Sequence, residues 1–463
     1  DADALRRSEG LASWQRRMGL RTRARLEQAP LAVDDLELLA GRLDASQAAI
    51  AASDVASAKT YLAAYTWPGG QTGHCALDFR RLFEAGIDVV REDIRARVPG
   101  ADAEGAETLA SFLDALEGLA ALAGRVADTA EAAAAGAPAW RRAELAEMAA
   151  VCRHIRRRAP RTFREALQLL WLTNLAVEYA DAAGLICPGR LDRILRPFYD
   201  ADLRAGRLTR GQALVLIECL YLQINNFVPD GLAVAVMVGG TDAAGGDVTH
   251  DLSHLCLEAL RRTRLVYPTV GVCWHPGTPR ALSALACGLI AAGYATPAFF
   301  NDPVIRRGLE RLGLPAADAC NYINSTCVEI TPVGRSNVWV ASPYFSLCQY
   351  LLDEIAAQAE AARPAADFDA FLAAYFRRLA AAIAEAVEGR GGARRTRQQR
   401  RRHGGKPLQS VFTRDCMARA RDIDAGGALT NWVECSFVGI ANLADSLDVI
   451  RAEVFETRAL EWA

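Results

Sequence analysis

Lysine is scarce in this chain, and its scarcity narrows the chemistry that the chain can perform. Of 53 basic residues, only Lys59 and Lys406 are lysines, and all the others are arginines. Schiff-base and pyridoxal-phosphate chemistry both require a lysine amine. Neither lysine lies in an apolar, motif-like segment, so the sequence argues against this chemistry.

Long uncharged apolar runs and a signal peptide are also absent from the sequence. A membrane-spanning helix needs about 20 consecutive apolar residues, so we expect no membrane span. The net charge is −2, which gives no general attraction to nucleic acid or to a membrane surface. We therefore expect a cytoplasmic protein that binds neither nucleic acid nor membranes.

Paired cysteines are missing as well, although the chain contains 12 cysteines. No two of them form a Cys-x-x-Cys motif, and none has a zinc-like spacing to a histidine. Scattered thiols are typical of a reducing compartment rather than of a disulfide-rich secreted domain. We expect no metal site and no disulfide framework.

Apolar patterning predicts helices in an N-terminal part, to about residue 180, and an alternation of strands and helices afterwards. Helices are predicted over 34–41, 104–135, 140–158, 161–182, 189–205, 209–225, 246–262, 279–293, 303–312 and 345–362. Thr162 is a candidate N-cap, because Glu165 follows three residues later. Short apolar strands are predicted over 232–238, 266–272, 298–300 and 322–330.

The alternating order predicts an α/β fold, a mostly parallel sheet or barrel with helices outside. We treat residues 1–463 as one barrel domain. The segment 389–405 is rich in glycine and arginine. We interpret it as a solvated surface loop rather than a nucleic-acid arm, because it has no interleaved aromatic residues.

A thiol and a carboxylate lie two residues apart in the segment 324–329, Asn-Ser-Thr-Cys-Val-Glu. In an extended segment, residues i and i+2 face the same side, so Cys327 and Glu329 can point into one cavity. A thiol can attack a substrate as a nucleophile, or it can carry a radical. A nearby carboxylate can accept or donate the proton that such chemistry requires. Buried cysteines are common, and the spacing alone favours a core cysteine beside a surface glutamate.

The surroundings of Cys327 favour the functional interpretation. Several stretches occur in order along the chain: Gly73-His74-Cys75-Ala76-Leu77-Asp78-Phe79, Pro188-Gly189-Arg190-Leu191-Asp192, Gly239-Gly240-Thr241-Asp242, His275-Pro276-Gly277-Thr278-Pro279, Pro297-Ala298-Phe299-Phe300-Asn301-Asp302, Thr326-Cys327-Val328-Glu329, Asp415-Cys416 and Asp422-Ile423-Asp424-Ala425-Gly426-Gly427. Together they resemble the glycyl radical enzymes, the family of pyruvate formate-lyase and the glycerol and diol dehydratases, in which the catalytic cysteine lies in a Gly-Cys-Val-Glu run.

The resemblance implies a fold and a set of site residues. The fold would be a helix-rich, glycyl-radical-enzyme-like β/α barrel, incomplete at its C-terminal end. Cys327 would become a thiyl radical, Glu329 would act as acid or base, and His74 would face the substrate. Three aromatic residues would also bind the substrate: Phe300, Trp339 and Tyr344.

The family stores its radical on a glycine in an Arg-Val-x-Gly-Tyr loop, and this sequence has no such loop. We therefore expect no cofactor bound in this chain. A glycyl radical would be supplied by a partner subunit or a missing segment, after the action of an activating enzyme. We also expect a homo-oligomer.

Two positions depart from the family's diol dehydratases. Ala341 stands where they place an aspartate, and Gly184 falls about where the glycerol-type enzymes have a histidine. In those enzymes, the aspartate and the histidine would hold hydroxyl groups of the substrate. Because this chain has neither, the resemblance implies that its substrate is a small polar metabolite other than a simple diol.

Three functions remain open. The first is a lyase that cleaves a C–O, C–N or C–C bond with an externally supplied radical. The second is a non-radical enzyme on the same scaffold, with a Cys327 thiolate and Glu329 as base. The third is a non-catalytic binding subunit, against which the Cys-Val-Glu run argues.

Overall fold

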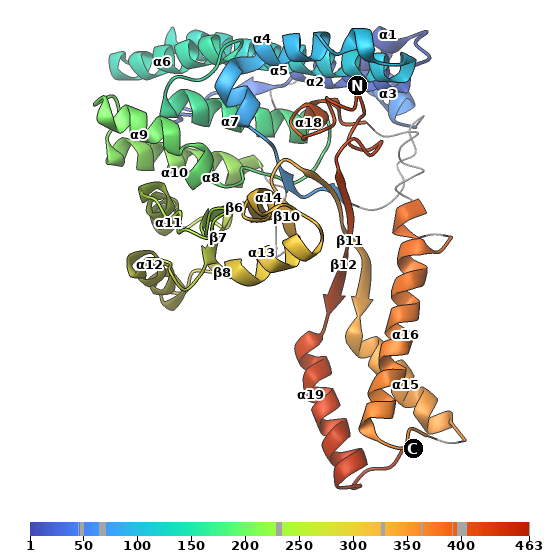
Figure 1. Ribbon diagram of the computed structural model, residues 1–463. Helices are drawn as coiled ribbons and strands as arrows, with labels where there is room; N and C mark the ends of the chain where they lie inside the picture. Colours follow the sequence, from blue (N-terminus) through green and yellow to red (C-terminus); the bar gives the residue numbers. More distant parts are fainter. Residues whose placement is uncertain are drawn as a thin grey trace. The chain divides into compact units, whose positions relative to one another are not determined.

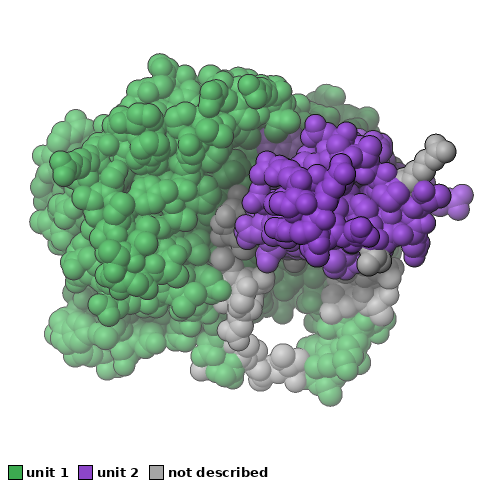
Figure 2. Space-filling model, turned by 90° about the horizontal axis from the view of Figure 1, so that it is seen from below, with its two compact units in different colours: residues 1–67, 73–338, 401–431 green, residues 68–72, 339–400, 432–463 purple. Residues whose placement is uncertain are grey.

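The computed structural model describes residues 1–44, 46, 51–63, 71–227, 234–325, 329–362, 364–390, 392–395 and 405–462. The chain divides into two compact units, which are coloured separately in Figure 2. Unit 1 comprises residues 1–67, 73–338 and 401–431, and unit 2 comprises residues 68–72, 339–400 and 432–463.

Helices dominate the described part of unit 1 up to Ala180 (Figure 1). They are α1 (Ala2–Ser8), α2 (Trp14–Glu27), α3 (Ala52–Ala63), α4 (Arg80–Arg95), α5 (Ala103–Ala134), α6 (Ala139–Ile155) and α7 (Phe163–Ala180). Two short strands, β1 (Leu31–Ala32) and β2 (Arg42–Leu43), pair in antiparallel orientation. The helices predicted over 104–135, 140–158 and 161–182 are therefore confirmed within three residues at each end.

Glycines allow α2 to pack closely against α5. A Cβ atom on Gly19 would lie 2.6 Å from the Cα atom of Ser111, and one on Gly118 would lie 2.9 Å from the Cα atom of Arg23. Cβ atoms do not approach other atoms so closely, so the two helices reach this distance only because both side chains are absent. Gly118 therefore serves packing, although it weakens the helical pattern of the sequence.

The predicted cap of α7 is confirmed. The Thr162 hydroxyl accepts a hydrogen bond from the backbone N–H of Glu165 at 3.2 Å, which satisfies one of the donors that a helix start leaves open. The helix predicted over 34–41 is wrong. The Gln168 side chain exchanges hydrogen bonds of 2.8 and 2.9 Å with the backbone of Ala40, so contact with α7 outweighs the weak local preference for a helix.

Parallel strands form the wall of a β/α barrel in unit 1. Strand β4 (Cys75–Ala76) pairs with β5 (Ile186–Cys187), and β7 (Thr269–Trp274) pairs with both β6 (Ala235–Gly239) and β8 (Ala298–Asn301). A parallel bridge between Gly189 and Val236 links the two groups. The intervening and following helices are α8 (Leu191–Ile194), α9 (Arg196–Arg204), α10 (Arg210–Phe227), α11 (Asp251–Thr263), α12 (Arg280–Ala291), α13 (Asp302–Arg311), α14 (Ala316–Ala319) and α18 (Pro407–Val411). The predicted alternation and α/β class are confirmed.

A hairpin replaces the single strand predicted over 322–330. Strand β9 (Tyr322–Asn324) pairs with β10 (Ile330–Pro332) in antiparallel orientation, with Asn324 opposite Ile330. The backbone N–H of Asn324 donates a hydrogen bond to the Met237 sulfur at 2.7 Å, which attaches β9 to β6. Glu329 therefore lies in the turn of the hairpin, and Cys327 lies outside the described residues.

One arginine joins this hairpin to the barrel wall. Arg190 has none of its surface exposed. Its guanidinium donates hydrogen bonds to the carbonyl of Gly239 in β6, and to those of Cys320 and Tyr322 at 3.4 and 3.3 Å. It also lies 5.7 Å from the centre of the Tyr322 ring. The buried carboxylate of Asp302, which accepts a 3.0 Å hydrogen bond from the Tyr322 hydroxyl, lies in the same network.

Unit 2 contains three longer helices and most residues of a small sheet. The sheet has the order β12–β11–β3, from Thr430–Val438, Ser336–Ser346 and Gln71–Gly73, and the helices are α15 (Leu347–Glu360), α16 (Phe368–Glu388) and α19 (Ile440–Ile450). Its core consists of Phe345, Leu347, Leu351, Phe371, Tyr375, Leu379 and Ile450. Most of the predicted basic loop, namely residues 391 and 396–404, lies outside the described residues.

Replacing Arg190 with methionine should destabilise unit 1 strongly. The change leaves buried carbonyl groups without their donor and removes a cation from beside buried carboxylates, which costs about 3–5 kcal/mol in comparable cases. The measurement is the midpoint of urea unfolding. Arg196→Met is the matched control, because that side chain is 51% exposed in an ion pair with Asp200, and it should cost less than about 1 kcal/mol. Equal effects of the two substitutions would contradict the role given to Arg190.

Candidate functional site

His74 lies between β3 and β4 and is 4% exposed. Its backbone has the left-handed value φ = +51°, which is uncommon for a residue other than glycine. The backbone N–H donates to the carbonyl of Gly184 at 3.4 Å. The ring atom Nδ1 lies 3.4 Å from the hydroxyl oxygen of Ser325, so the ring reaches the hairpin that follows 251 residues later in the chain.

Glu329 reaches the same hydroxyl from the other end of the hairpin turn. Its carboxylate oxygen Oε2 accepts a hydrogen bond from Ser325 Oγ at 3.3 Å, and its backbone carbonyl accepts one from the Ser325 N–H at 2.8 Å. The structure therefore brings together His74 and Glu329, two of the predicted site residues. Ser325, which joins them, was not among the site residues predicted from the sequence.

Burial governs the electrostatics around His74. Burial lowers the pKa of His74, the nearby Glu329 carboxylate acts to raise it, and the nearby Lys406 ammonium lowers it further. Because the ordinary pKa of histidine is 6.5, the ring is mostly neutral at neutral pH. A neutral imidazole has one donor and one acceptor nitrogen, so its hydrogen-bond partners determine its tautomer.

Lys406 is buried beside this site, contrary to the impression given by its sequence context. Only 2% of its surface is exposed, and its backbone N–H donates to the Asp422 carboxylate at 2.9 Å. Burial raises the pKa of Asp422 to about 6 and that of Asp181 to about 7. The apolar residues that follow Lys406, in the segment 407–412, were the available signal of its burial.

Two buried thiols line the strands under the hairpin. Cys187 in β5 donates a hydrogen bond to the Ser325 carbonyl and accepts one from the Ala235 N–H at 3.4 Å. Cys75 in β4 accepts one from the Gln409 side chain at 3.1 Å. Burial raises the pKa of Cys75 to about 11 and that of Cys187 well above its ordinary value. Both groups therefore remain thiols at neutral pH.

The three aromatic candidates have different surroundings. Phe300 lies in β8 and is 8% exposed. Its ring packs against the backbone of Gly271, where a Cβ atom would lie only 2.9 Å from the ring. The same Cβ atom would lie 3.2 Å from Asn324 Oδ1. Phe300 therefore lies near the residue that precedes Ser325. Tyr344 belongs to unit 2 and is 62% exposed, and the side chain of Trp339 lies outside the described part. Substrate binding by these three residues stays a prediction.

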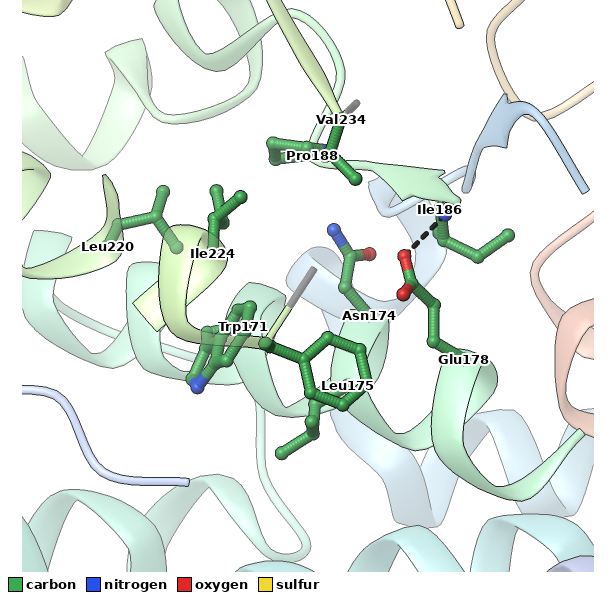
Figure 3. A pocket seen from close by; sticks show the side chains of 10 residues that line it. Trp171, Asn174, Leu175, Glu178, Ile186, Pro188, Leu220, Ile224 and Val234 are labelled. Carbon is green, nitrogen blue, oxygen red and sulfur yellow. Dashed lines mark hydrogen bonds between the residues drawn. The ribbon is translucent and has the colours of Figure 1, made fainter. Parts of the chain in front are cut away.

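A small cavity lies between the helices α7 and α10 and the strand β5 (Figure 3). Its volume of about 10 Å³ accommodates roughly one water molecule, so it is too small for a metabolite. Figure 3 shows Asn174 and Glu178 reaching from α7 toward Ile186, whose N–H donates to the Glu178 carboxyl. Burial raises the pKa of Glu178 to about 8.

A larger cavity of about 480 Å³ lies at the other end of the hairpin. Asn321 and Val333, beside the bases of β9 and β10, line it together with the aromatic rings of Phe79, Phe83 and Phe198. Neither His74 nor Glu329 is part of this lining. Within the described ranges, no helix is long and apolar enough to span a membrane. No group of three or more His, Cys, Asp or Glu residues in those ranges could hold a metal ion.

Residues 48–463 match the family model described as pyruvate formate lyase-like. Among curated proteins, the chain is 29% identical to a (2S)-3-sulfopropanediol dehydratase from Klebsiella oxytoca, over 70% of this chain and 42% of that protein. It is 25% identical to a trans-4-hydroxy-L-proline dehydratase from Clostridioides difficile, over 69% of this chain and 44% of that protein. The chain thus spans less than half the length of these two relatives.

Solved structures share the fold along the whole chain. A structure concerning 1,2-propanediol dehydration in Roseburia inulinivorans superimposes with a TM-score of 0.89 at 24% identity, covering 100% of this chain and 68% of that chain. The glycerol-bound B12-independent glycerol dehydratase from Clostridium butyricum gives 0.85 at 21% identity, covering 100% of this chain and 69% of that chain. These likenesses confirm the helix-rich β/α barrel predicted from the sequence.

The stability of the folded chain should depend on the ionisation of Glu178. Its pKa is about 8 in the folded chain and 4.5 ordinarily, so between these values the folded state keeps a proton that the unfolded state loses. The contribution of Glu178 to the free energy of unfolding is fully present below pH 4.5. It falls by on the order of 1 kcal/mol per pH unit as the pH rises toward 8. Glu178→Gln should flatten this decline in urea unfolding curves measured between pH 5 and 8.

Glu92→Gln provides the control, because the Glu92 carboxylate is 66% exposed. It should leave the pH dependence of stability unchanged. Parallel pH curves for the parent chain and Glu178→Gln would contradict the assignment of a raised pKa to Glu178.

Proposed function

Because this chain belongs to the pyruvate formate lyase-like family, we propose that it acts as a lyase on a small polar metabolite by radical chemistry. The observation that carries the proposal is the position of His74 and Glu329 on one hydroxyl at the turn of the hairpin. In the sequence, Cys327 stands between Ser325 and Glu329. The relatives named as dehydratases support the class of reaction.

In this proposal, Cys327 is a thiyl radical that removes a hydrogen atom from a substrate carbon. Glu329 receives a proton from the neighbouring hydroxyl or amine and gives it to the group that leaves the adjacent carbon, which returns Glu329 to its starting state. The cleaved bond is C–O, C–N or C–C. His74 faces the substrate, and Phe300 packs beside it. The radical intermediate then regains the hydrogen atom from Cys327, which restores the thiyl.

The radical would come from outside the residues of this sequence. The chain contains no Arg-Val-x-Gly-Tyr segment, and it spans 42–44% of the length of the two dehydratases. We propose that a glycine radical on a partner subunit, or on a further segment, supplies the oxidising equivalent to Cys327 after treatment by an activating enzyme. No cofactor then needs to bind this chain itself.

The substrate is proposed to differ from a simple diol. Gly184 and Ala341 offer no polar side chain where diol dehydratases would hold hydroxyls. The relatives' names include a sulfonate and a cyclic amino acid as substrates, so a panel of hydroxylated sulfonates and amino acids is the first choice for testing.

Cys327→Ala should abolish turnover in the activated, complete enzyme, because the thiol performs the hydrogen abstraction. Glu329→Gln should fold normally but lower kcat by about 10²–10⁴-fold, the usual contribution of a general acid–base group. The measurement is anaerobic product formation across the substrate panel. Cys287→Ala, which changes an exposed cysteine, is the matched control and should retain activity.

Two outcomes in air would contradict the radical proposal. Sustained aerobic turnover by the purified chain, lost in Cys327→Ala, would instead identify a thiolate enzyme. Full aerobic activity in Cys327→Ala would leave the thiol without a catalytic role.

The chain alone should develop no glycine-centred doublet in electron paramagnetic resonance after anaerobic treatment with an activating enzyme and S-adenosylmethionine. The reason is that the sequence offers no Arg-Val-x-Gly-Tyr loop. Addition of the radical-bearing part should restore the doublet. A doublet from the isolated chain would show that the radical source lies within these 463 residues.

A further inference from the structure

The cavity of about 480 Å³ at the base of the hairpin has a wall that backbone hydrogen bonds hold together. The N–H of Gly334, which follows β10, donates to the carbonyl of Ala76 at 2.8 Å. The N–H of Asp78 donates to the carbonyl of Phe412 at 2.8 Å, and the N–H of Arg414 donates to the carbonyl of Gly334 at 2.8 Å. Three segments far apart in the sequence thus form one preformed wall, as is usual for small-molecule sites of this size.

Part of the lining is a group of aromatic rings. The ring centres of Phe79 and Phe83 lie 5.3 Å apart. The ring of Phe198 meets that of Phe83 edge to face, with the centres 5.5 Å apart. The rings are therefore fixed by contacts with one another, and they offer a rigid surface on which an aromatic group can pack.

Arg193 brings a cation to the same cavity. Its guanidinium donates hydrogen bonds to the carbonyl of Cys320 at 3.0 Å and to that of Thr241 at 2.8 Å. No carboxylate in the described part of the chain forms an ion pair with it. Burial and the Arg190 cation lower the pKa of Arg193, whereas the Asp192 carboxylate raises it. Because a buried charge without a counterion is costly, an anion in the cavity would be stabilised there.

The other cavity charges add to this preference for an anion. Asp318, which also lines the cavity, is shared by two arginines, Arg335 and Arg414. One carboxylate therefore faces two guanidinium groups, which leaves an excess of positive charge at this wall. The side chain of Arg80 is 64% exposed, and its ion pair with Asp78 at 2.6 Å balances its charge.

We propose that this cavity binds a small carboxylate with an aromatic body, the carboxylate at Arg193 and the body against the phenyl rings. A guanidinium matches a carboxylate in charge and in the geometry of its donors. A cation in the cavity would find the Glu84 carboxylate, but this side chain is exposed and solvent screens its charge. The proposal does not depend on the lyase activity, because neither His74 nor Glu329 lines this cavity.

Isothermal titration calorimetry of the 463-residue chain with hydrocinnamate tests the proposal. Hydrocinnamate has one carboxylate and one phenyl ring, and it should bind at a single site. Hydrocinnamyl alcohol keeps the ring without the charge, and inorganic phosphate has the charge without the ring. Each should bind at least about tenfold more weakly, because each lacks one of the two interactions.

Two substitutions place the ligand in the cavity. Arg193→Met removes the cation, and Phe198→Ala removes a partly buried ring. Each should weaken hydrocinnamate binding by about tenfold. Arg196→Met is the matched control, because that side chain is 51% exposed and does not line the cavity, and it should leave the affinity unchanged. Glu329→Gln should also leave it unchanged, which separates this cavity from the turn of the hairpin. If Arg193→Met does not fold, Phe198→Ala decides.

Four results would overturn the proposal. The first is the absence of saturable hydrocinnamate binding up to about 10 mM, where an affinity is too weak for a specific site. The second is equally tight binding of the alcohol, which would show that the charge has no role. The third is unchanged affinity in the folded cavity variants. The fourth is loss of binding in the complete enzyme, which would show that the rest of that enzyme fills the cavity.

Discussion

The buried guanidinium of Arg190 determines where the site can form. It lies among carbonyl groups from two parts of the chain, the end of β6 and the base of the hairpin, and donates to both. A charge in the interior is tolerated only when its donors are used and an opposite charge is near, and Asp302 lies in the same network. The base of the hairpin is held in this way on the side of β9, the strand that leads to Ser325.

Hydrogen bonds to the backbone of Asn324 and Ser325 hold the described part of the site. The Cys187 thiol, the Met237 sulfur and the Glu329 carbonyl all bond to the backbone of Asn324 or Ser325. The thiols of Cys75 and Cys187 near the site are neutral because burial raises the pKa of each. Reactive side chains on a rigid support in weakly polar surroundings need little rearrangement when a proton moves.

The sequence predicted elements well where a local pattern is sufficient. The helix predicted over 104–135 is Ala103–Ala134 in the structure, and the strand predicted over 298–300 is Ala298–Asn301. The hairpin was missed because the sequence between β9 and β10, residues 325–329, contains no glycine, proline or asparagine that would mark a reversal of the chain. A continuous run of strand-forming residues does not reveal that the chain folds back on itself.

The site was predicted through family motifs rather than through its geometry. His74 and Glu329 were named, but their common contact with Ser325 joins parts of the chain 251 residues apart, which no local pattern encodes. Ser325 itself is an ordinary residue type with no periodicity. Lys406 was misjudged because a lysine is seldom buried, and only the tertiary structure places it within the core.

The distribution of the two lysines has a practical consequence for physical studies of this protein. Lys59 is exposed on α3, whereas Lys406 is enclosed by the fold. Of the two lysines in these 463 residues, reagents that acylate exposed amines at neutral pH should therefore attach to Lys59. A fluorophore or a surface tether can thus be placed at one defined position on α3 without mutagenesis, far in sequence from the hairpin. Acylation of Lys406 would then report that unit 1 has opened.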